Sequence, residues 1–191
     1  QFRQGAWSRW TNAALLKLLV REVTTVVALD RTLIAGSSNY RDGRTNGGML
    51  RLFDLERQVS GESLLGKAMS VGPLAMADVD GDGLLDLFVG GRAVAGRYPE
   101  AAPSLLLRNI GGRFEVTQRF AGDRSVGLVN GATLADLDHD GDPDLLLAVE
   151  WGPVRVWRNT GGTFEPWDPV LRGDGLGGDL VRLSQLTGWW T

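Results

Sequence analysis

Two nine-residue segments carry aspartates at the same positions. Residues 78–86 read DVDGDGLLD and residues 136–144 read DLDHDGDPD, so both place carboxylates at positions 1, 3, 5 and 9. These carboxylates converge only if the chain winds tightly, and a glycine at position 6 of each segment allows that winding. The residues concerned are Asp78, Asp80, Asp82 and Asp86 in the first segment and Asp136, Asp138, Asp140 and Asp144 in the second.

Four carboxylates in one loop need a cation or must spread apart. Two carboxylates about 5 Å apart repel each other by roughly 3 kcal/mol even at an effective dielectric constant of ~20. Six or seven oxygen ligands in a flexible loop suit calcium better than magnesium, and the chain has no cysteine and one histidine to offer zinc. The backbone carbonyls of Leu84 and Asp142, at position 7, would add one ligand each. The sequence therefore predicts two calcium sites.

Two other interpretations of these segments are less consistent with the sequence. The helical calcium loop of sensor proteins needs a Glu at position 12 and flanking helices, whereas position 12 here is Val89 or Leu147 inside a β-type apolar run. The segments are therefore not expected to form a calcium-switched helix pair. The other alternative is a solvated acidic turn without an ion, and the repetition of the regular spacing speaks against it.

A second motif repeats in step with the first. Residues 108–115 read RNIGGRFE and residues 158–165 read RNTGGTFE, with six of eight positions identical. The two ordered matches define a repeat unit. Each unit is expected to contain a strand, the acidic turn, a strand, a loop, a strand, a Gly-Gly hairpin and a fourth strand. Four antiparallel strands per unit are typical of a propeller blade.

The repeat predicts an all-β fold, a partial β-propeller of about three four-stranded antiparallel blades with calcium loops between strands 1 and 2. A weaker first unit has Leu29-Asp30-Arg31 in place of the acidic loop. The expected organisation is an N-terminal segment at 1–22 (a strand or a short helix), a degenerate blade at 23–70, calcium-loop blades at 71–128 and 129–185, and the start of a further blade at 186–191. The expected strands are 23–28, 32–35, 49–53, 74–77, 85–89, 104–107, 113–117, 132–135, 144–149, 154–157 and 163–167.

These motifs together resemble the FG-GAP or VCBS repeat of the integrin alpha-subunit propeller and of many bacterial extracellular proteins, including those that carry an ASPIC/UnbV domain. The resemblance covers roughly residues 23–191. It implies a seven-bladed, calcium-bearing β-propeller used for adhesion or ligand binding, with structural ions. It also implies that the carboxylates at positions 1, 3, 5 and 9 of both acidic segments are the metal ligands.

Composition excludes several classes of partner and site. The formal net charge is −3, and the 20 Lys and Arg residues form no block, so nucleic acid is not expected as a partner. The absence of cysteine excludes disulfides. The apolar run at 13–20 is interrupted by Lys17 and is too short to cross a bilayer. Weak calcium sites favour an extracellular, periplasmic or cell-surface location, where calcium is plentiful.

Catalysis is not expected of this chain. His139 is the only histidine, so a nucleophile–base–orienter triad has no natural base. The expected function is a non-catalytic calcium-binding module for extracellular protein or glycan binding, adhesion or assembly. The alternative is a non-catalytic propeller portion of a polysaccharide-active or other secreted enzyme.

Strand parity places a recognition face opposite the acidic loops. In a four-stranded meander the acidic loops and Gly-Gly turns share one face, and the loops between strands 2 and 3 share the other. Trp157 and Trp167 are expected to pack between blades. Solvated loops without a ligand are the alternative. The binding residues expected on the recognition face are Tyr40, Arg97, Tyr98 and Trp151.

An incomplete set of blades predicts a partner. Three blades and a fragment cannot close a ring, and the open ends would expose strand edges and apolar faces. We therefore expect completion by other propeller blades, by another protein chain or by copies of this chain.

Overall fold

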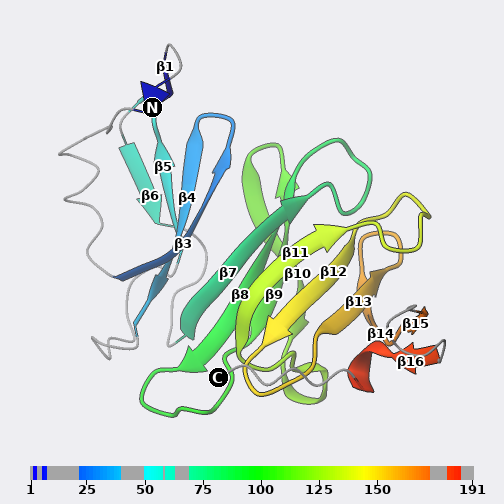
Figure 1. The fold of residues 1–191 in the computed structure, drawn as a ribbon. Coiled ribbons are helices and arrows are strands. Elements are labelled where there is room, and N and C mark those ends of the chain that lie inside the picture. Colours follow the sequence, from blue (N-terminus) through cyan, green and yellow to red (C-terminus); the bar gives the residue numbers. More distant parts are fainter. Residues whose placement is uncertain are drawn as a thin grey trace.

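The computed structural model describes residues 2–3, 6–7, 22–39, 50–57, 59–62, 69–172 and 180–185. These residues form three four-stranded antiparallel sheets and two small two-stranded ones (Figure 1). Helical structure in this part of the chain is confined to two short 3-10 turns, Gly122–Arg124 and Leu183–Gln185. The predicted all-β fold is confirmed.

Each large sheet is a meander whose strands pair in chain order. The first contains β3 (Glu22–Leu29), β4 (Thr32–Ser38), β5 (Leu50–Asp54) and β6 (Val59–Glu62). The second contains β7 (Met69–Ala77), β8 (Asp86–Val94), β9 (Ser104–Ile110) and β10 (Arg113–Phe120). The third contains β11 (Val129–Ala135), β12 (Asp144–Val149), β13 (Arg155–Asn159) and β14 (Phe164–Trp167).

The first strands of the sheets are neighbours in space. Strand β7 contacts β3 and β4 on one side and β11 on the other, so the second sheet lies between the first and the third (Figure 1). The acidic loops follow β7 and β11, at one end of these strands. The loops that follow β8 and β12 lie at the other end, as strand parity predicts.

Side chains of the second sheet alternate between two apolar cores. Leu87 and Val89 of β8 are buried in the core shared with the first sheet, whereas Phe88 between them is buried in the core shared with the third. Because successive side chains of a strand point to opposite faces, a continuous apolar run is what a strand covered on both faces requires.

Aromatic rings fix the packing of the second sheet on the third. Phe120 meets Phe88 edge to face at 5.7 Å between ring centroids, and it meets Trp157 in the same way at 5.0 Å. Trp157 is buried, as predicted. Trp167 is half-buried, and the Arg158 guanidinium lies over its ring, 5.6 Å from the centroid.

Several elements differ from or extend the sequence-based expectation. Strand β6 was not predicted, and the segment after β14 contains a hairpin of β15 (Val170–Arg172) and β16 (Leu180–Arg182). Near the N-terminus β1 (Phe2–Arg3) pairs with β2 (Ala6–Trp7). The remainder of segment 1–22 before Glu22, and residues 186–191, lie outside the described residues. Within the described part, no helix has the length and apolarity needed to cross a membrane.

Candidate metal centres in the acidic loops

Both acidic loops have left-handed residues at the same two positions. Position 4 is left-handed in each, with φ of 76° at Gly81 and 63° at His139. Position 6 is also left-handed, with φ of 87° at Gly83 and 96° at Gly141. Because left-handed residues turn the chain back on itself, the aspartates on either side of them are brought together. The second loop therefore adopts left-handed residues at both positions with only one glycine, because its position 4 is His139.

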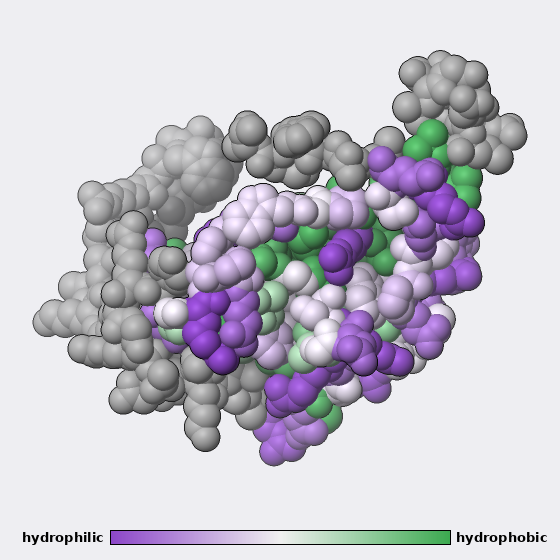
Figure 2. Space-filling model, turned by 90° about the horizontal axis from the view of Figure 1, so that it is seen from below, coloured by the Kyte–Doolittle hydropathy of each residue, from purple (hydrophilic) through white to green (hydrophobic). Residues whose placement is uncertain are grey.

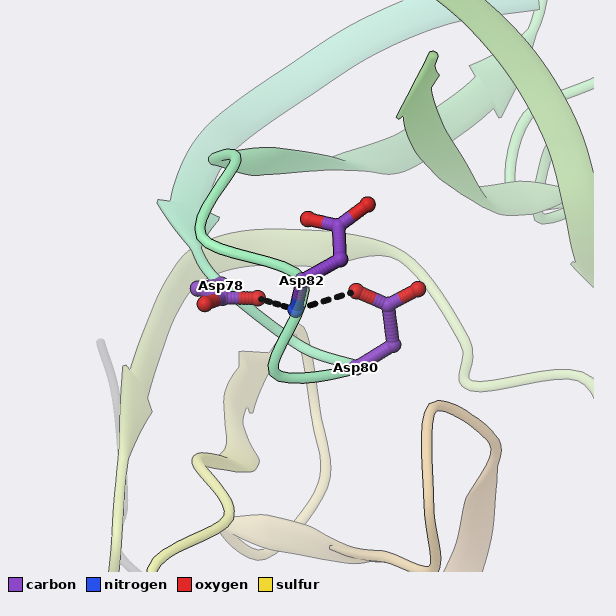
Figure 3. A group of neighbouring side chains, drawn as sticks. All are labelled: Asp78, Asp80 and Asp82. Carbon is purple, nitrogen blue, oxygen red and sulfur yellow. Dashed lines mark hydrogen bonds between the residues drawn. The ribbon is translucent and has the colours of Figure 1, made fainter.

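In the first loop, three carboxylates gather around the turn. Asp78, Asp80 and Asp82 each offer an oxygen, and these oxygens lie within 4.8 Å of one another. Asp78 accepts hydrogen bonds from the backbone nitrogens of Gly81 (2.8 Å) and Asp82 (3.1 Å) through Oδ1 and of Gly83 (2.9 Å) through Oδ2. Figure 3 shows Asp78 and Asp80 on either side of the Asp82 nitrogen, to which both are hydrogen-bonded. These bonds hold the carboxylates close despite their like charges.

In the second loop the corresponding group is Asp136, Asp138 and Asp144, whose oxygens also lie within 4.8 Å of one another. The Oδ1 atoms of Asp136 and Asp138 are buried and make no hydrogen bond within the described part of the chain. Buried carboxylate oxygens without a partner are costly, and a cation would satisfy them. The residues of this loop therefore fit a hard cation such as calcium.

The aspartate at position 9 of each loop accepts hydrogen bonds from two separate backbone segments and so holds them together. Buried Asp86 accepts hydrogen bonds from the backbone nitrogens of Val79 (3.1 Å) and Asn109 (2.8 Å). Asp144 accepts the equivalent bonds from Leu137 (3.1 Å) and Asn159 (2.9 Å). Asp144 also belongs to the carboxylate group of its loop, whereas Asp86 lies outside the group formed by the first three aspartates of its own.

The pKa of Asp86 is raised from its ordinary value. Burial is the largest cause, and the negative charge of Asp80 adds to it, while the two backbone hydrogen bonds and Arg108 act in the opposite direction. Asp86 is thus held in an environment that disfavours the charged form of its carboxylate. Added positive charge in the loop would stabilise that charged form.

The other predicted ligands lie around these groups. Leu84 is exposed, and its backbone nitrogen donates to Oδ1 of Asp82 (2.8 Å). In the second loop Oδ1 of Asp140 accepts from the backbone nitrogen of Asp142 (3.0 Å). Neither Asp140 nor Asp142 belongs to the group of converging oxygens that the described residues form.

The arginine of each Arg-Asn-x-Gly-Gly motif pairs with the acidic loop of its own sheet. The Nε atom of Arg108 lies 2.8 Å from Oδ2 of Asp80. Arg158 forms an ion pair with Asp138 and approaches Asp140 to 3.4 Å. The sequence identifies the motif as a repeat and a hairpin but does not predict this ion pair. The arginine follows its loop partner by 28 residues in the first unit, from 80 to 108, and by 20 residues in the second, from 138 to 158, so the spacing gives no consistent signal of this pairing.

The asparagine of the same motif anchors the Gly-Gly turn. Oδ1 of Asn109 accepts from the backbone nitrogen of Gly112 (2.7 Å), and Oδ1 of Asn159 accepts from that of Gly162 (2.9 Å). The third-sheet turn also packs against the first acidic loop, because a Cβ atom at Gly162 would lie 3.1 Å from Cβ of Asp80. The acidic loop of the second sheet and the Gly-Gly turn of the third sheet are therefore in direct contact.

At the other end of the sheets, two of the predicted binding residues are in contact. Tyr98 and Trp151 meet edge to face at 5.6 Å between ring centroids, and the Tyr98 hydroxyl donates to Oε1 of Glu150 (2.7 Å). Arg97 is exposed and pairs with Glu100 (3.0 Å) in the same loop. Tyr40 lies outside the described residues.

Comparison with known families gives one match. The model of the FG-GAP-like repeat matches residues 78–147 and again residues 136–184, a span that covers more than half of the 191 residues and contains both acidic loops. A search of curated proteins finds no match to the chain.

Proposed function

The chain belongs to the FG-GAP-like repeat family, and from this we propose that its sheets are blades of a calcium-bearing β-propeller that binds a partner and does not catalyse a reaction. The contacts of β7 with both β3 and β11 support this proposal, since the first strands of successive blades are neighbours around a propeller axis. Calcium occupies both acidic loops in this proposal, and its role there is structural.

The strongest support for this proposal comes from two buried carboxylate oxygens of the second loop that have no hydrogen-bond partner in the described part of the chain. Oδ1 of Asp136 and Oδ1 of Asp138 are buried, lack hydrogen-bond donors in the described structure and lie in a group with the fully buried Asp144. Arg158 supplies one positive charge to this group, which holds three carboxylates. A divalent cation would supply the missing charge and the missing ligand contacts together.

The ions would stabilise the junctions between strands and between blades. Each acidic loop joins the first two strands of its sheet, and the first loop also contacts the Gly-Gly turn of the third sheet. A bound ion that holds the first loop in one conformation therefore also supports the packing of one blade on the next. A calcium Kd of ~10⁻⁴ to 10⁻³ M, typical of extracellular modules, would keep the sites filled only where calcium is abundant. We propose an extracellular or periplasmic location for that reason.

Thermal unfolding in the presence and absence of calcium tests the proposal. A ligand that binds only the native state stabilises it by RT ln(1 + [L]/Kd), about 1.4 kcal/mol per site when calcium is tenfold above Kd. We expect millimolar calcium to raise Tm, a chelator to lower it, and the same concentration of magnesium to have a much smaller effect. An identical Tm in calcium and in chelator would overturn the proposal.

A further inference from the structure

A cavity of about 400 Å³ opens at the end of the sheets opposite the acidic loops. Its lining comes from the first two sheets, from the loop after β8 and from residues that flank β11 and β12, and it includes Ser38, Ser70, Arg92, Tyr98 and Glu150. Figure 2 views the molecule from this side and shows a hollowed face on which hydrophilic side chains surround hydrophobic ones. Neither the carboxylate groups of the acidic loops nor the family match accounts for this cavity.

We propose that this cavity binds one pyranose ring of a carbohydrate, an inference that rests on the binding role proposed above and gives it a ligand class. A sugar hydroxyl both donates and accepts hydrogen bonds, so a sugar site needs donors and acceptors side by side. The cavity provides Arg92 as a donor, Glu150 as an acceptor, and hydroxyls that do both, including the hydrogen-bonded pair of Ser70 and Ser38 (2.7 Å).

The carboxylate of Glu150 is poised for a hydrogen-bond donor. Its Oε1 atom accepts the Tyr98 hydroxyl, whereas Oε2 is buried and makes no hydrogen bond within the described part of the chain. A buried carboxylate oxygen without a donor is unfavourable, and a ligand hydroxyl entering the cavity would satisfy it. The phenol of Tyr98 at the same time fixes the orientation of the carboxylate.

An aromatic surface stands beside the cavity. Trp151 is 68% exposed and packs edge to face on Tyr98, which leaves much of the indole free to stack on the apolar face of a sugar ring. The backbone of Trp151 is left-handed, with φ of 57°. For a bulky residue this conformation is strained, and such strain concentrates at functional sites. A strained turn therefore exposes the large side chain of Trp151 to solvent.

The charges in the cavity favour a neutral ligand over a cationic peptide. Two carboxylates, Glu22 and Glu150, could attract a Lys or Arg side chain, and the aromatic pair could add a cation–π contact. Arg92 lines the same cavity, however, and would repel a cation. A polyhydroxylated ring can use both signs of charge, because its hydroxyls accept from the guanidinium and donate to the carboxylates.

Saturation-transfer NMR and tryptophan fluorescence on the calcium-loaded chain test this inference. The probes are free glucose, galactose, mannose, fucose and N-acetylglucosamine, each at millimolar concentration, and a short lysine- and arginine-rich peptide. We expect at least one sugar to bind, Trp151→Ala and Glu150→Gln to weaken that binding by about tenfold or more, and Trp151→Phe to retain most of it. Val59→Ala is the matched control, because it truncates an exposed apolar side chain on the first sheet.

Failure of this inference can be distinguished from failure of the proposed function. No sugar binding, sugar binding that survives both Trp151→Ala and Glu150→Gln, or binding of the basic peptide alone would each overturn the carbohydrate site. If calcium still raises Tm in the same samples, the proposed calcium-bearing module remains supported although the carbohydrate site is rejected. Trp151→Ala lies far along the strands from both acidic loops and should leave that rise unchanged.

Discussion

Asn159, at the end of β13, donates a hydrogen bond from its side-chain amide to the carbonyl oxygen of Val79, 80 residues earlier in the chain, at 2.8 Å. Val79 lies in the acidic loop of the second sheet, and Asn159 anchors the Gly-Gly turn of the third. Both residues are buried. One side chain therefore connects the first candidate metal loop, the second sheet and the third.

This connection predicts different costs for two equivalent substitutions. Asn109 and Asn159 both anchor a Gly-Gly turn, but among the bonds described only Asn159 also donates to the loop of the preceding sheet. Asn159→Ala leaves the buried Val79 carbonyl without this donor, which costs about 1–3 kcal/mol. We expect Asn159→Ala to lower the free energy of unfolding by at least about 1 kcal/mol more than Asn109→Ala in urea titrations. Equal losses would show that the inter-sheet bond contributes little.

The left-handed turn of the first loop predicts a second effect on stability. A Cβ atom at Gly81 would meet nothing within 4 Å, so the cost of Gly81→Ala arises from its φ of 76° alone. We expect a loss of about 1 kcal/mol in the free energy of unfolding. Gly61→Ala is the matched control, since its Cβ would also meet nothing and Gly61 has no left-handed φ. It should be neutral or slightly stabilising, and a similar loss at both positions would contradict this account of the loop.

Arg158 is expected to oppose calcium in the second loop. Its guanidinium pairs with Asp138 and lies near Asp140, so a calcium ion bound there would meet a like charge a few ångströms away. Removing that charge with Arg158→Gln should tighten calcium binding by roughly threefold to tenfold, equivalent to about 1 kcal/mol of relieved repulsion in a partly exposed site.

The control for this experiment is Arg113→Gln, since Arg113 is exposed and forms its ion pair with Glu115 on its own strand. It removes the same charge and should leave calcium affinity unchanged. Weaker calcium binding in Arg158→Gln would contradict this prediction and would show that the arginine holds the loop in its ion-binding conformation.

The fold was predictable because its signal is local. The apolar run Leu87, Phe88 and Val89 indicates a strand covered on both faces, and the repeated Gly-Gly turns set the hairpins. Trp157 was predicted as a core residue from its place on a strand. Its partner Phe120 was not, since that contact depends on how two sheets pack.

The candidate site was predictable only in part. The spacing of the aspartates identifies both loops, yet it does not separate Asp86, which latches the backbone, from Asp78, which joins the carboxylate group. The contact between Tyr98 and Glu150 joins residues 52 positions apart and follows from the packing of two sheets. Such contacts have no signal in the spacing of either motif.

Calorimetric titration of calcium into the metal-free chain counts its calcium sites directly. We expect two bound calcium ions per chain, one in each of the variants Asp80→Asn and Asp138→Asn, and none when both substitutions are combined. Asp123→Asn, which removes an exposed carboxylate outside the loops, should keep two. Circular dichroism would verify that each variant is folded. Absence of calcium binding to the folded wild-type chain, or binding of two ions to the double variant, would show that the acidic loops are not the calcium sites.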